Sequence, residues 1–253
     1  MRRGASLAGP IVLLAAIVAA WEWYVRSRGL GYVLPAPSDI VAALRDNRSE
    51  LRSDTAATLG EMLSGFAVAL ALGLAAAVTL HASELLRRAA YPLLVASQSV
   101  PLLALAPLLV IWLGFGLGPK LAVVALLCFF PITVGALDGL RSVDADYPRM
   151  MRTLHAGRLA TFRRVEVPWA LPSTFSGTRV AAAYAAVAAM FAEYAGGASH
   201  GLGVTMQTAT STGDSALVGA AVLLLSALAL GLFAAVTLIE RLLLPWAREP
   251  LRR

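Results

Sequence analysis

The sequence contains little charge. Only 14% of its 253 residues are Asp, Glu, Lys or Arg, whereas 58% are hydrophobic. Soluble domains carry about 25% charged residues, so this chain has too few to cover the surface of one or two soluble domains. Its apolar residues instead form long blocks, near the roughly 17 to 25 residues that cross a bilayer as a helix. We therefore predict an all-α membrane protein that crosses the bilayer several times.

Cysteine and histidine are also scarce, which argues against several kinds of site. The only cysteine, Cys128, cannot form a disulfide within the chain, and we expect it to be a small buried hydrophobic side chain. The histidines, His81, His155 and His200, are too scattered to match the spacing of metal ligands. The sequence shows no Ser/His/Asp arrangement either. We therefore expect no catalysis, metal or other cofactor on this chain.

Lysine occurs once, as Lys120, at the end of the segment GFGLGPK. This segment superficially resembles a phosphate-binding loop, but its glycines miss the G-x-x-x-x-G-K-[ST] spacing and leucine follows the lysine. We predict a tight turn there and no nucleotide site. The remaining basic residues are arginines, which typically flank membrane helices on the cytoplasmic side. The net charge of +6 is therefore no sign of nucleic-acid binding.

Six apolar blocks predict membrane helices. Their ranges are roughly 7–25, 58–81, 90–113, 119–138, 178–197 and 215–244. If the N-terminus is cytoplasmic, 15 basic residues fall in inner segments and six in outer segments, so both termini are predicted to be cytoplasmic. The first block could instead be a cleaved signal peptide. An uncleaved helix is favoured because the block is long and ends in aromatic anchors: Trp21, Trp23 and Tyr24.

Two of these blocks are rich in small residues: VALALGLAAAV in 58–81 and VAAAYAAVAAM in 178–197. Lipid supplies no hydrophobic drive for helices to associate, so close approach of their backbones through Ala and Gly must hold them together. We expect these faces to pack inside a bundle, or across a dimer.

The third block, 90–113, is interrupted by prolines: Pro92, Pro101 and Pro107. Three polar residues stand beside the break: Ser97, Gln98 and Ser99. One interpretation is a kink whose hydroxyl groups bond back to the helix. The other is a polar patch on a translocation path, because freed carbonyl groups at membrane depth are tolerated where they line a cavity.

Glu193 lies about 21 Å along the fifth block from Arg179, at 1.5 Å per residue. A carboxylate inside a membrane helix is a functional candidate by default. The alternative is an interfacial carboxylate that pairs locally, just before the Gly196-Gly197 turn. The candidate translocation residues are therefore Ser97, Gln98, Ser99, Pro101 and Glu193. Solvation at helix ends is expected to explain the other carboxylates: Glu61, Asp138 and Glu240.

The outer connection, 26–57, contains the stretch LPAPSDIVAALRDNRSE. Pro35 and Pro37 break the chain, and Ser38 or Asp39 can cap a short amphipathic helix. Three residues are expected on its apolar side: Ile40, Val41 and Leu44.

The inner connection, 139–178, is too long for a simple link. Asp144 and Asp146 can cap a helix that starts near Pro148 and ends at Gly157. Its apolar side would hold Met150, Met151 and Leu154, and its basic side Arg149 and Arg152. A second short helix is expected through Phe162 and Val165, with stops at Pro168 and Pro172. A short amphipathic helix of this kind fits a partner's groove, or lies on anionic lipid.

This inner connection resembles the E-A-A loop of binding-protein-dependent ABC importer permeases. VEVP at 165–168 matches the end of the pattern, and ALP at 170–172 matches a second proline turn in the nitrate/sulfonate/taurine branch. Counting back puts the glycine of the pattern at His155 and its E-A-A at 149–151, where none of the residues match. The resemblance assigns the contact with an ATPase to this segment: Arg149, Met150, Met151, Arg152, Thr153, Leu154, His155, Ala156, Gly157 and Pro168.

The resemblance continues along most of the chain. It is carried by LPAPSDIVAAL, TLGEMLSGFAVALALG, SVPLLALAPLLVIWLGFGLGPK, CFFPITVGALDGL and FAEYAGGASHGLGV, in that order. CFFPI together with AEYAGG and GLG is most similar to permeases for pyrimidine precursors of thiamine. Permeases for riboflavin, nitrate, sulfonate or taurine are similar as well, and the solute stays open between these classes.

The resemblance implies one permease domain over 1–253 that works as a homodimer in the bacterial inner membrane. It also implies a cytoplasmic ABC ATPase dimer, which would hold ATP and Mg, and an external solute-binding protein. An ion-driven carrier would instead need inverted repeats and paired midplane charges, and a membrane enzyme would need clustered acid and base groups. The sequence shows neither pattern.

Overall fold

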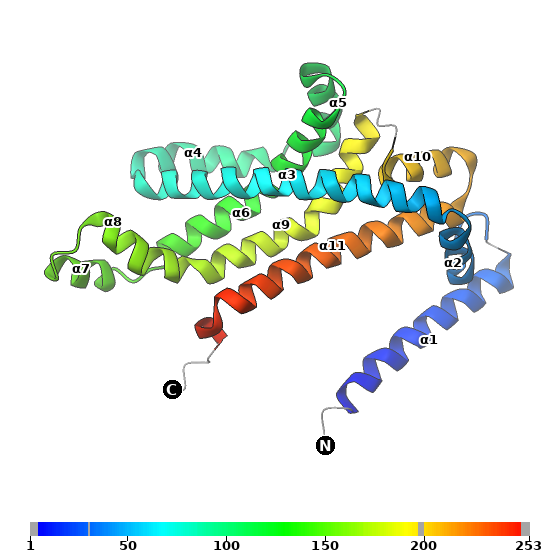
Figure 1. The fold of residues 1–253 in the computed structure, drawn as a ribbon, viewed down its shortest axis with the longest axis horizontal. Helices are drawn as coiled ribbons and strands as arrows, with labels where there is room; N and C mark the ends of the chain where they lie inside the picture. The colour runs from blue at the N-terminus through cyan, green and yellow to red at the C-terminus, as the bar shows by residue number, and fades with distance from the viewer. Residues whose placement is uncertain (1–4, 30, 197–199, 249–253) are drawn as a thin grey trace. The chain divides into compact units, whose positions relative to one another are not determined.

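The computed structural model describes residues 5–29, 31–196 and 200–248, and the regular elements within these ranges are all helical (Figure 1). The predicted all-α class is therefore confirmed. Five helical stretches are long and apolar enough to span a membrane: Gly9–Arg28, Arg48–Ala82, Leu117–Arg141, Arg158–Ala195 and Ser215–Leu243. The arginines near both chain ends that enter the orientation argument include Arg2, Arg3, Arg252 and Arg253, which lie outside the described residues, as does Gly197.

The elements follow one another along the chain with short connections. They are α1 (Ala5–Arg28), α2 (Pro37–Asp46), α3 (Arg48–Ala82), α4 (Glu84–Ser97), α5 (Leu102–Leu113), α6 (Leu117–Arg141), α7 (Asp146–Thr153), α8 (Arg158–Thr161), a π-helical turn (Phe162–Glu166), α9 (Val167–Ala195), α10 (Leu202–Thr212), α11 (Ser215–Leu243) and a final 3-10 turn (Pro245–Arg248). The chain forms two compact units, one from 1–57 and 199–225 and the other from 58–198 and 226–253. Helices α3 and α11 continue from one unit into the other.

The second predicted span begins earlier than expected. Helix α3 has 35 residues, so at 1.5 Å per residue it is about 52 Å long, against about 30 Å for the hydrocarbon core of a bilayer. Its first ten residues are mostly polar and belong to the first unit. Hydropathy marks only the part of a helix that lipid or protein surrounds, which is why the sequence placed the start near residue 58.

The third predicted span, 90–113, is two helices. Helix α4 ends at Ser97, and α5 begins after Pro101, which occupies its N-cap position. Proline disfavours helical geometry in the residue before it and lacks an N–H group, so the chain turns at Val100–Pro101. Pro92 and Pro107 lie inside α4 and α5 and end neither helix.

The predicted stops at Pro168 and Pro172 are wrong, because the chain is helical without a break from Arg158 to Ala195. The π-helical turn just before Pro168 gives the reason. There the N–H of Val167 donates to the carbonyl of Phe162, five residues back. Such a turn is wider than an α-helical one, so it accommodates the proline ring that would otherwise clash with a carbonyl of the preceding turn. The fifth span therefore grows directly out of the inner connection.

Small residues hold the second unit together, as predicted. Helices α6 and α9 run side by side (Figure 1), and they meet at Gly135 and Gly177. A Cβ on Gly177 would lie 2.2 Å from the carbonyl oxygen of Pro131. Helix α3 packs on α6 in the same way, since a Cβ on Gly65 would lie 2.5 Å from that of Val124.

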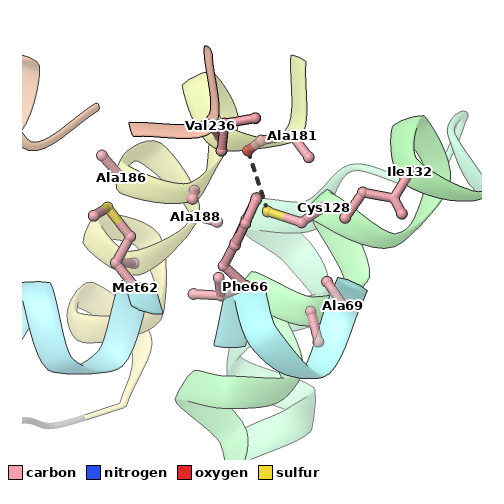
Figure 2. Close-up of a cluster of buried hydrophobic side chains, with 14 residues drawn as sticks. Met62, Phe66, Ala69, Cys128, Ile132, Ala181, Ala186, Ala188 and Val236 are labelled. Carbon is pink, nitrogen blue, oxygen red and sulfur yellow. Dashed lines mark hydrogen bonds between the residues drawn. The ribbon is translucent and has the colours of Figure 1, made fainter. Parts of the chain in front are cut away.

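A buried apolar cluster fills the space between these helices. Figure 2 shows its labelled members: Met62, Phe66 and Ala69 from α3, Cys128 and Ile132 from α6, Ala181, Ala186 and Ala188 from α9, and Val236 from α11. The thiol of Cys128 is buried and donates to the carbonyl of Ala181 at 3.4 Å. The expectation that Cys128 is a small core side chain is confirmed.

In the first unit, α2 is the predicted amphipathic helix with a different cap. Ala36 takes the N-cap position, and Asp39 Oδ2 accepts from the Ala36 N–H at 3.3 Å. Ser38 does not cap the helix; its hydroxyl donates to Glu22 at 2.7 Å. Ile40 and Ala43 are buried, whereas Val41 is 45% exposed. The buried side of the helix therefore includes Ala43 rather than the predicted Val41. Arg26 joins α1 to α2 through an ion pair with Asp39 at 2.8 Å.

Candidate functional site

The inner connection begins with α7, a helix of eight residues. It starts at Asp146, where Asp144 Oδ1 accepts from the Asp146 N–H at 3.0 Å and Arg149 pairs with Asp146 at 3.0 Å. The helix starts two residues ahead of the predicted start at Pro148, and its N-cap residue is Ala145, which makes no side-chain cap hydrogen bond. Of the two predicted carboxylates, only Asp144 binds a backbone N–H at this end, whereas Asp146 lies inside the first turn. The helix ends at Thr153 rather than at Gly157.

The apolar side of α7 is uncovered. Tyr147 is 43% exposed, Met150 52% and Leu154 67%, and only Met151 is half-buried. Arg149 and Arg152 are exposed as well. Apolar side chains at this level of exposure on a short helix indicate a surface that another molecule covers.

His155 explains how the connection turns without the glycine of the E-A-A pattern. Its φ is 55°, and it is the one non-glycine with positive φ among the described residues. The His155 N–H donates to Arg152 O and the Ala156 N–H to Met151 O, both at 3.0 Å. These bonds close the helix end in the way that a left-handed glycine usually does. His155 therefore adopts the left-handed conformation that glycine adopts readily, at a conformational cost of about 1–2 kcal/mol.

The second half of the connection is fastened to the last turn of α3 by three side chains, which we call the α3 clamp: His81, Arg158 and Glu166. Arg158 Nη2 donates to Ala82 O at 3.0 Å. His81 Nε2 lies 2.9 Å from Glu166 Oε2, and both side chains are largely buried. The ring of His81 also lies 6.2 Å from that of Phe162. Sequence spacing could not reveal these contacts, because about 80 residues separate the partners.

Two further contacts fix the surroundings of the clamp. The rings of Tyr147 and Trp169 lie 5.5 Å apart, which braces α7 against α9. Directly after α3, Ser83 Oγ caps α4 by accepting from the Leu86 N–H at 3.3 Å. A hydrogen bond from Arg88 lowers the pKa of the exposed Glu84 in the first turn of α4.

The structure gives Glu193 a partner that is distant in the sequence. Its side chain is 1% exposed, and its Oε1 accepts a hydrogen bond of 2.6 Å from the hydroxyl of Thr58 on α3. The carboxylate therefore ties α9 to α3 inside the bundle.

Glu61 lies one helical turn after Thr58 on α3 and forms a buried ion pair with Lys120. Solvation therefore does not explain the position of Glu61. Glu61 is 7% exposed and Lys120 8%, and Lys120 lies in the first turn of α6. The second carboxylate oxygen of Glu61 has no hydrogen-bond partner within the described part of the chain. We call Thr58, Glu61, Lys120 and Glu193 the buried charge cluster. The one sign of it in the sequence is that its charged members stand inside long apolar blocks or at their edges.

Two other predicted carboxylates differ in their surroundings. Asp138 is exposed, as expected for a solvated helix end. Glu240 is instead paired with Arg179, which joins α11 to α9.

The residues at the α4–α5 break do not lie at one site with Glu193. Ser97, Gln98, Ser99 and Pro101 are exposed, whereas Glu193 is buried. The hydroxyl of Ser97 donates to Leu94 O at 2.7 Å, as in the kink interpretation. Helix α5 does approach α9 next to Glu193, because Ala106, Val123 and Ala192 pack together.

The first unit contains a polar pocket that the sequence did not indicate. Its volume is about 410 Å³, and Glu50, Asp54, His200 and Thr208 lie in its wall. Asp54 caps α10, since it accepts from the Gly201 N–H at 3.1 Å and from the hydroxyl of Thr205. Among the residues that the structure describes, no group of three His, Cys, Asp or Glu side chains could hold a metal ion.

Comparison with known proteins adds a family and several relatives. The family described as binding-protein-dependent transport system inner membrane component matches residues 69–249. A formylaminopyrimidine transport permease from Halalkalibacterium halodurans is 36% identical over 250 residues, which cover 98% of this chain and 100% of the relative. A riboflavin transport system permease from Chloroflexus aurantiacus is 34% identical, over 94% of this chain and 89% of the relative. A taurine transport system permease from Escherichia coli is 30% identical, over 93% and 88%.

Proposed function

The chain belongs to the family of binding-protein-dependent transport system inner membrane components, and we propose that the solute it imports is a formylated aminopyrimidine or a close relative of one. It is the permease subunit of an ABC importer in the inner membrane. The family implies two kinds of partner, an ATPase and a solute-binding protein. ATP and Mg would be held by the ATPase rather than by this chain.

The choice of solute is supported by the full-length similarity to the formylaminopyrimidine permease, at 36% identity over 98% of the chain. Riboflavin, sulfonates and taurine are the alternatives, because permeases for these solutes are also similar. All of these alternatives keep the same mechanism and change only the solute that the binding protein delivers.

We further propose that α7 is the contact with the ATPase. The single observation that carries this proposal is its exposed apolar side on a helix that is braced to the membrane spans. The contact segment would comprise Arg149–Gly157, with Pro168 at the base of the fifth span. An amphipathic helix that offers Met150 and Leu154 beside two arginines suits a groove of mixed apolar and acidic character. Lipid binding of the same face is the competing role.

Topology and assembly are proposals of the same kind. From the excess of arginine in the connection between α6 and α9 we propose that this connection and both termini are cytoplasmic. The outer connection and α10 would then face the binding protein. A homodimer would provide two α7 helices for two ATPase subunits, whose closure on ATP would move both connections and alternate access to the solute.

For the translocation path we propose the exposed polar surface at the α4–α5 break: Ser97, Gln98, Ser99 and Pro101. In this proposal Glu193 lies next to the path, because α5 packs against α9 at Ala192, the residue before it. Its carboxylate is buried and bonds α9 to α3. A carboxylate so deeply buried would come to line the path only after α3 and α9 separate.

Gentle purification of the tagged chain from its native membrane tests the ATPase contact. We expect mass spectrometry to identify a co-purifying ABC ATPase and a solute-binding protein. The variant Leu154→Asp should abolish co-purification of the ATPase while the chain still inserts, because it charges the apolar side of α7. Leu117→Asp is the matched control, since Leu117 is 54% exposed at the opposite end of α6. An ATPase that co-purifies equally with wild type and Leu154→Asp would contradict the proposed role of α7.

A further inference from the structure

From two sets of polar contacts of α3 we infer a role for the α3 clamp, which consists of His81, Arg158 and Glu166. The clamp makes α3 follow the inner connection when the ATPase moves that connection. These three are positioning residues for the coupling of ATP hydrolysis to import. The inference rests on the proposed function, because it assumes that the ATPase acts on α7.

Helices α6 and α9 need no such device. They are the direct continuations of the inner connection at its two ends, and they are packed with no room to slide. A Cβ on Gly135 would lie 2.9 Å from Gly177 Cα, and the hydroxyl of Ser173 donates to Gly135 O at 2.9 Å. Packed interiors of this density transmit a displacement rather than absorb it. Any movement of the connection therefore moves α6 and α9 together.

Helix α3 is different, because α4 and α5 separate it from the connection in the sequence. Its last turn meets the connection only through space. The clamp makes that link with a hydrogen bond from a guanidinium group to the carbonyl of Ala82 and a His81–Glu166 contact at 2.9 Å. Hydrogen bonds with a charged partner are about twice as strong as neutral ones and directional. They therefore add a direct link between α3 and the connection to the apolar packing of α3 on α6.

The part of α3 at which the helix enters the second unit shows where the movement would arrive. Thr58 and Glu61 bind Glu193 and Lys120 on α9 and α6. Glu61 and His81 are 20 residues apart on one helix, which is about 30 Å at 1.5 Å per residue and equals the hydrocarbon thickness of a bilayer. The polar contacts of α3 therefore stand at both faces of the membrane, with the apolar cluster of Figure 2 between them. A clamp at one face brings residues 58–82 of α3 into the body that carries the buried charge cluster at the other.

The experiment compares two variants of the clamp with a matched control. The complex is purified through this chain with its ATPase and binding protein and is reconstituted into liposomes. Uptake of radiolabelled formylaminopyrimidine and ATP hydrolysis are then measured in the same preparation. The clamp variants are Arg158→Gln and Glu166→Gln. The control is Arg163→Gln, which removes the same charge from an exposed position of the same segment.

We expect the clamp variants to assemble with the ATPase and to hydrolyse ATP, but to import about tenfold less solute per ATP, the factor that corresponds to losing one charge-assisted hydrogen bond. Arg163→Gln should keep the wild-type ratio. A ratio unchanged in the clamp variants would overturn the inference and leave the proposed function intact. Absence of ATP-driven uptake in the wild type would instead contradict the proposed function.

A swapped variant separates positioning from simple loss of folded protein. His81→Glu combined with Glu166→His retains the pair in reverse orientation. We expect it to restore the uptake per ATP to within about threefold of wild type, since the contact reforms with the same two groups. A swap that restores the amount of folded protein but not the ratio would show that the pair serves stability alone and would overturn the inference.

Discussion

At the scale of single residues, the buried pair of Glu61 and Lys120 is the most consequential feature of the chain. Lys120 is the one lysine in the sequence, and its side chain is 10% exposed. Moving an ammonium or a carboxylate group out of water costs several kcal/mol per group. The two groups stay charged when buried because the attraction between them compensates this cost. Their position between α3 and α6 makes this contact sensitive to any relative movement of these helices.

Lys120→Met should therefore lower the free energy of unfolding by about 3–5 kcal/mol, because it leaves the carboxylate of Glu61 buried without its partner. The double variant Glu61→Leu with Lys120→Met should recover most of that loss. Denaturant titration of the purified chain in detergent measures both. Equal stability of the single and double variants would contradict the account of this pair.

The same residue scale shows what sequence reasoning could and could not supply. It singled out Glu193 because a carboxylate inside an apolar block is rare, and the structure buries that side chain. It assigned Glu61 to a solvated helix end and Lys120 to a tight turn, because both stand near the ends of apolar blocks and nothing in a single sequence pairs residues 59 positions apart. His155 shows the converse: its mismatch with the family pattern raised the question of the turn, and only its backbone angle answers it.

At the scale of helices, the contact between α6 and α9 depends on glycine. A Cβ on Gly177 would lie 2.2 Å from the carbonyl oxygen of Pro131, and backbone atoms cannot move aside as a flexible side chain can. The two helices are therefore as close as their backbones allow, as in other membrane bundles with small residues at the interface. This close approach is what lets them move as one body.

We expect Gly177→Ala to lower the free energy of unfolding by about 3 kcal/mol, at the upper end of the effect of overpacking, because the helices must separate. Gly60→Ala is the matched control, since a Cβ on Gly60 meets no atom within 4 Å. It should be neutral or stabilise α3 by up to about 1 kcal/mol, the difference in helix propensity between the two residues. Thermal unfolding of the two variants side by side decides the matter, and equal losses would contradict the proposed packing.

Helix boundaries were the weaker part of the sequence prediction. The apolar blocks located each long helix but not its ends, since α3 begins about ten residues earlier and α9 continues through two prolines. The reasons are physical: hydropathy does not see the polar extension of a helix, and a π-helical turn removes the clash that makes proline a stop signal. The break at Pro101 was predicted correctly, because nothing there relieves the proline.

At the scale of the whole molecule, sequence and structure agree on class and role. The low charge and the apolar blocks predicted a polytopic all-α protein, and the motifs along the chain predicted the permease family to which it belongs. The solute could be predicted only as a set of related classes, because permeases for several solutes share the motifs of this chain. Cytoplasmic termini and the homodimer stay predictions.

The most direct test of the central proposal is uptake by the complex purified through this chain and reconstituted into liposomes. We expect uptake of radiolabelled formylaminopyrimidine that requires ATP and the binding protein, that unlabelled formylaminopyrimidine abolishes, and that excess taurine or riboflavin leaves unchanged. Competition by taurine or riboflavin would contradict the proposed solute. Uptake that proceeds without ATP, or no uptake of any of these solutes, would contradict the account of the chain as an ATP-driven importer of an aminopyrimidine.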